Sequence, residues 1–280
     1  MNASFNYVEA SLNYLRDMKE KPVIPMYTVG SGQATRLRDD CYVDHTMPIH
    51  NARAVGKRLS LDQEGFMLIA RDTAVSDFYD DKDVRSVYYP EVEQLIKDVT
   101  GACKAVIFDY TIRVQAVSKQ VEKGVRETVR LVHNDYTDKS GPQRVRDLVD
   151  AREAEERLKH RFAVYNVWRP IKRPVQAIPL AVCNAQSVAQ SDLVATDLDY
   201  GDRTGEIYQL TFNPGHRWFY FPHMDTKEVL IFKCYDSVAD NRARFTPHTA
   251  FEDPTTPPDA PERESIEVRT LAFFPPEEPE

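Results

Sequence analysis

The sequence lacks the features that mark a membrane, secreted or nucleic-acid-binding protein. No apolar run approaches the roughly 20 residues that span a bilayer, and residues 1–22 lack the charged-then-apolar order of a signal peptide. The net charge of -8 argues against a nucleic acid or an anionic membrane as a general partner. We therefore expect a cytoplasmic protein that binds neither.

Cysteines are few and scattered, and no two of them are close in sequence. The chain therefore contains neither a CxxC metal motif nor a disulfide framework, and we expect most of the cysteines to be small buried residues. They are Cys41, Cys103, Cys183 and Cys234.

Internal repeats and low-complexity linkers are also missing from the interior. Hydrophobic residues make up 42% and charged residues 29% of the 280 residues, which is ordinary for a globular protein. We predict a single domain over residues 1–280, with an N-terminal helical and strand extension over about residues 1–100. Residues 252–264 read as a proline-rich loop between two strands, and 275–280 as a short acidic tail.

Helical signals are concentrated in the first half. Residues 7–19 alternate apolar and polar positions at helical spacing. Pro90 can open a helix that Gly101 ends. Residues 141–162 predict a further helix, opened by Pro142 and capped by Ser140 or Gly141. Its apolar face contains Val145, Leu148, Val149 and Leu158.

Strand signals fill much of the remainder. These segments are rich in β-branched and aromatic residues and are separated by turn-forming residues, which favours hairpins in a sandwich or barrel. The fold class we predict is α+β with a mainly β core and helices packed outside. The predicted strands are 104–114, 161–171, 177–185, 206–214, 217–222, 228–236, 243–251 and 265–274.

The short stretch LVHNDYTD places His133 and Asp135 two residues apart. Such a pair can reach one metal ion from a strand end, because alternate side chains share a face. A non-haem iron(II) site needs a second imidazole on the same face of the ion. His248 follows after an interval long enough for several strands, so we prefer His133, Asp135 and His248 as ligands.

A second pair with the same spacing occurs at His223 and Asp225. It leaves only a short interval before His248, and its Met-Asp-Thr context is typical of a turn. We therefore assign His223 a supporting or structural role. A histidine beside an aspartate is more often a satisfied pair than a ligand, so the preference for His133 depends on the residues that follow His248.

The segment RESIEVR places Arg263, Ser265 and Arg269 on one face of a predicted strand. Guanidinium groups that point into a barrel are costly without an anionic partner, and they suit bidentate capture of a carboxylate. Two of them suit a dicarboxylate. Iron ligands followed by inward arginines indicate 2-oxoglutarate as a cosubstrate. The alternative is a solvent-exposed or ion-paired face.

Four blocks carry a family resemblance that extends from about residue 45 to residue 274. They are HNDYTDKSGPQRVRDL, YNVWRPIKRPVQAIPLAVCNAQSV, HRWFYFPHMDTKEVLIFKCYDS and RFTPHTAFEDP…RESIEVRTLAFF. The chain resembles the iron(II)/2-oxoglutarate-dependent dioxygenases, and within them the hydroxylase/desaturase family that includes the fungal gibberellin desaturase and the cephamycin methoxylation-associated protein. The Asn-x-Trp-Arg-Pro block is the most specific element.

This resemblance implies a double-stranded β-helix (jelly-roll) fold and hydroxylation or desaturation of a small secondary metabolite. Fe(II), 2-oxoglutarate and dioxygen would be required, with an iron(IV)-oxo intermediate. It implies His133, Asp135 and His248 as iron ligands, and Arg263 for the distal carboxylate of 2-oxoglutarate. Arg269 would lie near the C1 carboxylate, although the reverse assignment of the two arginines stays open.

Further site residues are predicted around these groups. Asn166 and Arg169 are candidates for the cofactor site, Arg169 as an anion-binding residue or as half of a structural ion pair. Residues 114–128 are a candidate lid or a plain surface helix. Candidates for the substrate pocket are Tyr136, Trp168, Trp218, Tyr220 and His223.

Two other functions remain open on the sequence alone. One is a metal-dependent enzyme of the same fold that does not use 2-oxoglutarate. The other is a non-catalytic jelly-roll protein that binds a ligand or assists another oxygenase.

Overall fold

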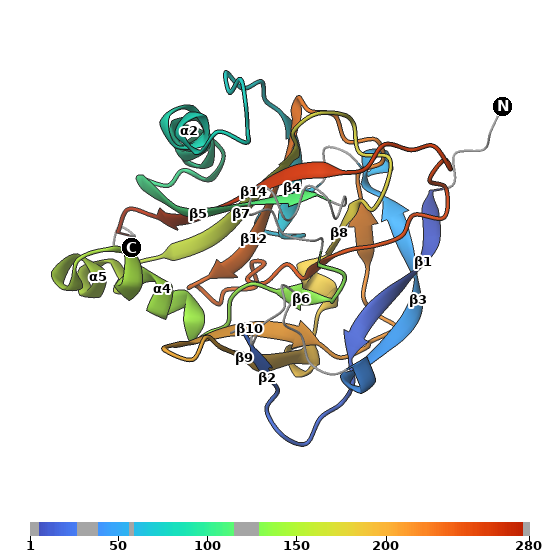
Figure 1. Ribbon diagram of the computed structural model, residues 1–280. Coiled ribbons are helices and arrows are strands. Elements are labelled where there is room, and N and C mark those ends of the chain that lie inside the picture. Colours follow the sequence, from blue (N-terminus) through green and yellow to red (C-terminus); the bar gives the residue numbers. More distant parts are fainter. Residues whose placement is uncertain (1–5, 27–38, 56–58, 115–128, 277–280) are drawn as a thin grey trace.

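Two β-sheets that face each other form the framework of the protein (Figure 1). The computed structural model describes residues 6–26, 39–55, 59–114 and 129–276. The first sheet has five strands, which are β4 (Phe66–Ala70), β5 (Lys104–Val114), β7 (Phe162–Pro170), β12 (Glu228–Asp236) and β14 (Glu264–Phe273). They pair antiparallel throughout, in the order β4-β12-β7-β14-β5.

The second sheet has nine strands and is mixed. They are β1 (Tyr7–Leu15), β2 (Val23–Pro25), β3 (Tyr42–Asn51), β6 (His133–Asn134), β8 (Leu180–Cys183), β9 (Leu193–Asp199), β10 (Thr204–Leu210), β11 (Trp218–Tyr220) and β13 (His248–Ala250). The order is β1-β3-β11-β8-β13-β6-β10-β9-β2. β11 runs parallel to β3 and β2 parallel to β9, while the other pairs are antiparallel.

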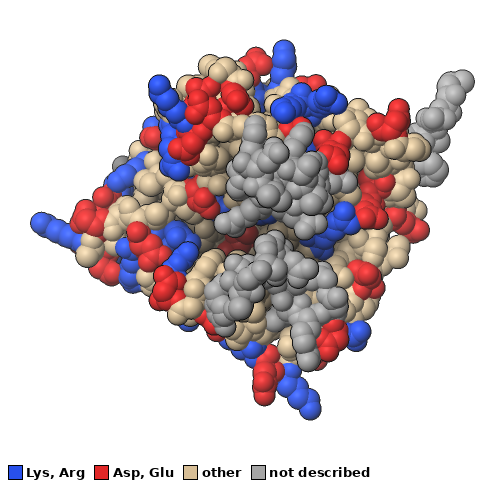
Figure 2. All heavy atoms as spheres, in the orientation of Figure 1, with Lys and Arg blue, Asp and Glu red and all other residues tan. Residues whose placement is uncertain are grey.

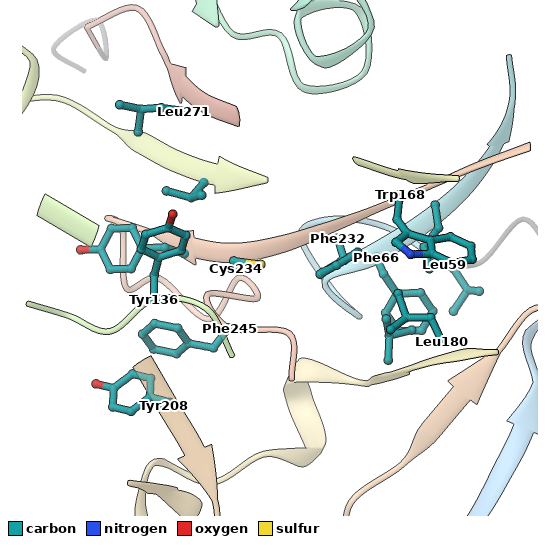
Figure 3. Packing of buried hydrophobic residues seen from close by; sticks show 14 of the residues in the cluster. Leu59, Phe66, Tyr136, Trp168, Leu180, Tyr208, Phe232, Cys234, Phe245 and Leu271 are labelled. Carbon is teal, nitrogen blue, oxygen red and sulfur yellow. The ribbon is translucent and has the colours of Figure 1, made fainter. Parts of the chain in front are cut away.

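The main core lies between the two sheets and follows from side-chain alternation along the strands. Val164 and Trp168 of β7 meet Val182 of β8 and Phe219 of β11 in one buried cluster. Figure 3 shows Tyr136, Phe245 and Tyr208 gathered at one end of this cluster and Trp168, Phe66 and Leu180 at the other. Alternate residues of the same strands point the other way, so both sheets also bury an outer face.

Helix α2 (Tyr89–Thr100) covers the outer face of the five-stranded sheet (Figure 1). Pro90 lies in its first turn, and Gly101 ends it with a left-handed φ of 75°, so both predicted limits are confirmed. Val92, Leu95 and Ile96 pack against this sheet. The short helix α1 (Asp81–Asp83) and a π-helical turn lead into α2.

The helix predicted over residues 141–162 is two helices, α4 (Ser140–Leu148) and α5 (Ala151–Arg157). Val149 adopts an extended conformation, and the Asp150 side chain accepts hydrogen bonds from the backbone of Arg152 and Glu153. An aspartate at this position begins a new helix, because its carboxylate satisfies the free N–H groups of the first turn.

The helix predicted over residues 7–19 is wrong, because β1 occupies Tyr7–Leu15. Val8, Ala10, Leu12 and Tyr14 are buried and the residues between them are more exposed, so the apolar period is two. The apolar residues of this segment also fit the spacing of a helix, which is why the sequence pattern indicated one. The predicted N-terminal extension also contributes β1, β2, β3 and β4 directly to the two sheets.

Most of the other strand predictions are confirmed, with boundaries shifted by a few residues. Residues 252–264 connect β13 to β14 as predicted, whereas most of the candidate lid at 114–128 lies outside the described residues. None of the helices in the described ranges is long and apolar enough to cross a bilayer. Acidic and basic side chains are interspersed over the face shown in Figure 2.

Candidate metal centre

His133, Asp135 and His248 come together between the two sheets. One potential ligand atom from each residue lies within 4.8 Å of the other two. The sheet register brings them together, because β6 pairs with β13 and His133 lies opposite His248. The two imidazole rings are 4.4 Å apart between centroids and tilted by 55°. The structure therefore assembles the three side chains that the sequence singled out.

Both imidazoles are oriented by the backbone. Nδ1 of His133 lies 2.7 Å from the Leu131 carbonyl oxygen, and Nδ1 of His248 lies 3.1 Å from that of Thr246. A carbonyl oxygen only accepts, so each Nδ1–H group donates to the backbone and each Nε2 is the ring nitrogen that faces the site. The two Nε2 atoms lie 3.5 and 3.9 Å from Oδ1 of Asp135. Two imidazole nitrogens thus face one carboxylate oxygen.

Burial keeps the His248 imidazole neutral. It lowers the pKa of His248 to about 4, and the neighbouring His133 acts in the same direction. Burial alone would raise the pKa of Asp135, but Arg269 and the two histidines hold it well below its usual range. His248 and Asp135 are therefore in the protonation states that a divalent cation requires.

Asn134, between the two predicted ligands, ties three segments together. The side chain is fully buried, and its amide N–H groups donate to the carbonyls of Tyr136 and Cys234 at 2.7 and 2.8 Å. Its carbonyl oxygen accepts from the backbone N–H of Thr246 at 3.1 Å. Because Thr246 precedes His248 by two residues, Asn134 fixes the position of one histidine segment relative to the other.

The second oxygen of Asp135 is held by the five-stranded sheet. Asn166 of β7 donates to Oδ2 from Nδ2 at 2.8 Å, and Arg269 of β14 donates from Nε at 3.0 Å. The two donors lie opposite each other in the β14–β7 register. With Oδ2 engaged, Oδ1 remains directed toward the histidines. Asp135 is therefore presented as a ligand through a single oxygen.

Arg269 is largely committed to protein partners. Besides Asp135, Nη2 donates to Glu267 at 2.6 Å, and Nη1 donates to Asp109 at 3.0 Å and Thr111 at 3.2 Å. Burial would lower the pKa of Arg269, but these carboxylates raise it well above its usual value. Four of the five guanidinium N–H groups are thus occupied. Only one N–H group of Arg269 therefore remains for the predicted contact with the C1 carboxylate of 2-oxoglutarate.

Arg263 has a different environment on the same face of the sheet. Only 3% of it is exposed, and burial lowers its pKa to about 9. Nη1 donates to the Ile178 carbonyl at 2.6 Å, and the guanidinium lies 5.6 Å from the Trp168 ring centroid. Nε of Arg263 and the hydroxyl of the fully buried Ser265 have no hydrogen-bond partner within the described part of the chain.

Of the predicted pocket residues, Tyr136 and Trp168 lie inside the central core. Burial raises the pKa of the Tyr136 hydroxyl, with the Arg269 and Arg144 cations opposing the shift. Trp168 packs under the Arg263 guanidinium. Tyr136 therefore lies near Arg269, and Trp168 lies against Arg263.

Trp218, Tyr220 and His223 do not join this site. Trp218 and Tyr220 point to the opposite face of β11, in a separate cluster, and the indole N–H of Trp218 donates to Tyr14 at 2.7 Å. Strand alternation places Phe219 in the central core instead. His223 is exposed on a turn with a φ of 50°, so the second His-x-Asp pair is a turn.

Arg169 also lies away from the metal centre. It points to the outer face of β7, the face covered by α2, and its guanidinium lies 5.8 Å from the Tyr88 ring centroid. Its neighbours Trp168 and Asn166 face inward. Odd and even positions of a strand occupy opposite faces, so Arg169 cannot share the site of Asn166.

The sequence interpretation missed Glu267, Asp109 and Thr111. Glu267 continues the spacing of Arg263, Ser265 and Arg269 along β14, so alternation could have identified it. Asp109 and Thr111 are supplied by β5, which pairs with β14, and the sequence contained no signal of that pairing.

The side chains present fit an iron and 2-oxoglutarate site. Two imidazoles and one carboxylate oxygen form the donor set of the non-haem iron(II) facial triad. Nε of Arg263 and the hydroxyl of Ser265, which have no partner among the described residues, offer two donors to a carboxylate.

Comparison with known proteins gives the same result. A family model described as "Oxidoreductase/YMDC permease-like domain" matches residues 12–273. The hydroxylase/desaturase efuI of Hormonema carpetanum is 32% identical, covering 95% of this chain and 95% of that protein. The alpha-ketoglutarate-dependent dioxygenase phiK of a fungal species is 35% identical, covering 76% of this chain and 79% of that protein.

A solved structure, that of the iron and alpha-ketoglutarate-dependent endoperoxidase NvfI, superposes with a TM-score of 0.85 and 29% identity. It covers 97% of this chain and 99% of that one. This match confirms the double-stranded β-helix with flanking helices. Together with the relatives, it shows that iron, 2-oxoglutarate and dioxygen are the requirements of this enzyme class. The chain belongs to the hydroxylase/desaturase family of Fe(II)- and 2-oxoglutarate-dependent oxygenases of secondary metabolism.

Proposed function

We propose that this oxidoreductase hydroxylates or desaturates a small natural product at the centre formed by His133, Asp135 and His248. The observation that supports it most directly is the placement of two complementary groups on one inner surface. The triad offers a divalent-cation site, and Arg263 with Ser265 offers a carboxylate site whose Nε and hydroxyl donors have no partner in the described part of the chain. One cosubstrate, 2-oxoglutarate, requires both.

In this proposal, His133 and His248 bind iron through Nε2, and Asp135 binds it through Oδ1. The tautomers and the single free carboxylate oxygen support this assignment. When bound, iron and 2-oxoglutarate with dioxygen supply an oxidant that removes a hydrogen atom from an unactivated carbon. The remaining residues hold and orient these groups.

Arg263 and Ser265 would hold the distal carboxylate of 2-oxoglutarate. The unpartnered Nε and hydroxyl are the groups available for it, and a carboxylate would return the guanidinium to an ordinary ionised environment. Arg269 would act mainly through Asp135, because most of its N–H groups are already bound. Asn166 would act in the same way from the other side.

The substrate would lie against the apolar wall that includes Tyr136 and Trp168, where water is excluded. We further propose that the substrate is a small molecule rather than a nucleic acid, that the enzyme is cytoplasmic and that the chain forms one domain. Both sheets contribute to a common core, which supports the last point.

The experiment that tests the proposal is an anaerobic titration of Fe(II) and 2-oxoglutarate, followed by the visible charge-transfer absorption of the iron chelate. We expect the band in the wild type and its loss in His133→Ala. The matched control is His223→Ala, which removes the exposed histidine of the other His-x-Asp pair and should leave the band intact. A band that survives His133→Ala, or no band in the wild type, contradicts the assignment.

A further inference from the structure

A second polar pocket lies on the outer face of the five-stranded sheet, away from the metal centre. Its volume is about 320 Å³. It is bounded by the segment before α1, by the end of β7 and by the turn before β12. The residues at its wall include Asp72, Asp77, Tyr79, Arg169, Lys172 and Lys227.

Arg169 is the buried cation of this pocket. Only 1% of it is exposed, and Nη2 donates to the carbonyl of Arg71 at 3.0 Å and to the carbonyl of Thr226. Among the described residues, Nε of Arg169 has no hydrogen-bond partner and no carboxylate forms an ion pair with this guanidinium. The ring of the buried Tyr88 lies under the same guanidinium, with 5.8 Å between the guanidinium carbon and the ring centroid.

The other buried cations differ from Arg169 in whether a carboxylate of the chain balances their charge. Among the residues that the structure describes, the fully buried cations are Arg169, Arg263 and Lys233. Lys233 lies 2.6 and 2.8 Å from the carboxylates of Asp62 and Asp236. Within the described ranges, the hydrogen bonds of Arg169 and Arg263 go to backbone carbonyls only. A buried charge without a counter-ion is unfavourable, so each of these two arginines suits an anion from outside the chain.

The wall of the pocket limits what that anion can be. Lys172 and Lys227 lie at the rim, where Lys172 is 3.2 Å from Glu264 and Lys227 is 4.0 Å from Asp72. Asp72 and Asp77 add negative charge at the same rim. These carboxylates disfavour a large polyanion, while the volume accommodates a small metabolite.

We propose that this outer pocket binds a small anionic metabolite whose carboxylate or tetrahedral oxyanion group is held by Arg169. The site is separate from the 2-oxoglutarate site, because Arg169 and its neighbour Trp168 point to opposite faces of β7. It therefore does not depend on the role of Arg263.

Isothermal titration of the iron-loaded protein under anaerobic conditions tests this inference, with succinate as the carboxylate probe and sulfate as the tetrahedral probe. In Arg263→Gln protein, in which the inner anion site is removed, we expect one probe molecule to bind per chain. Arg169→Gln should weaken that binding by roughly tenfold or more, because a charge-assisted contact is lost. The probe that binds more tightly identifies the class of anion.

A second variant guards against a folding defect in Arg169→Gln, which circular dichroism would reveal. Lys172→Gln combined with Lys227→Gln removes the exposed positive charges of the rim, and it should weaken binding roughly threefold with little structural risk. The inference is overturned if neither probe binds the Arg263→Gln protein at millimolar concentration. It is equally overturned if the affinity of folded Arg169→Gln or of the rim variant matches that of its parent.

Discussion

Arg269 lies in β14 and Arg263 directly precedes that strand, six residues away, yet their surroundings are opposite. Arg269 binds three carboxylates and a hydroxyl, and its pKa is raised well above the usual value. Arg263 binds one carbonyl and an aromatic face, and burial lowers its pKa to about 9. The two arginines therefore have different roles.

The difference separates structural from binding arginines. A guanidinium whose partners are all supplied by the chain stabilises the folded site but has little capacity left for a ligand. One whose partners are missing costs stability and is available to a ligand. The contrast gives four predictions, from the largest expected effect to the smallest.

Removing Arg269, whose partners belong to the protein, should have the largest effect. Arg269→Met leaves the buried carboxylates of Asp135 and Glu267 unpaired, so we expect a loss of about 3–5 kcal/mol in the free energy of unfolding. Urea denaturation of the metal-free protein measures it. Arg85→Met, which removes an exposed arginine paired with Asp81, is the control and should change stability by less than about 0.5 kcal/mol. A loss below about 1 kcal/mol in Arg269→Met would remove the distinction between the two arginines.

Removing Arg263 should weaken the binding of 2-oxoglutarate instead of the stability of the fold. Arg263→Met takes away a buried charge that lacks a carboxylate, so the unliganded protein should keep its stability or gain slightly. The affinity for 2-oxoglutarate should fall by about 2–3 kcal/mol, roughly 30- to 150-fold. Titration of the anaerobic iron-loaded protein measures this. A destabilised protein with unchanged affinity would reverse the two roles.

Ser265→Ala should produce a smaller effect of the same kind. Its hydroxyl has no partner among the described residues, so its removal leaves no protein group unsatisfied. One lost hydrogen bond to the distal carboxylate corresponds to about 1 kcal/mol, or roughly a fivefold weaker affinity for 2-oxoglutarate. The thermal midpoint of the unliganded protein should stay unchanged. A large drop in that midpoint would show that the hydroxyl is structural.

The outermost partner of Arg269 should matter least. The side chain of Asp109 is 54% exposed, and its ion pair with Arg269 is accessible to water. Asp109→Asn keeps an acceptor for Nη1 and should cost less than about 1 kcal/mol of stability. Its 2-oxoglutarate affinity should match that of the wild type. A larger cost would mean that the Arg269 network depends on its exposed end.

The sequence predicted the parts of the site that depend on short-range spacing. His133 and Asp135 lie two residues apart at a strand end, and alternation brings their side chains together; the same rule predicts a common face for Arg263 and Ser265. His248 could be paired with them because a long interval permits a return strand. The double-stranded β-helix itself came from the resemblance, since composition and strand signals alone indicated only a sandwich or barrel.

The remaining features depend on contacts between segments that are distant in sequence. Apart from Glu267 on the same strand, the partners of Arg269 come from β5 and from the residue after Asn134, and no local pattern predicts these contacts. The sequence of β1 predicts a helix incorrectly because its apolar residues fit both periods. They recur at the helical spacing of 3.6 residues as well as at the strand spacing of two. Trp218 and Tyr220 were placed on the wrong face because the phase of a short strand is set by its neighbours, β3 and β8.

Asn134 has a consequence for which ion the enzyme carries. It joins the segments of both histidines through hydrogen bonds that need no metal, so ion binding requires little ordering of the chain. A site prepared in advance discriminates among divalent ions mainly by donor chemistry, and imidazole and carboxylate donors favour cobalt, nickel and copper over iron. Iron loading then depends on the supply of metals in the cell, and traces of competing metals in a preparation will act as inhibitors.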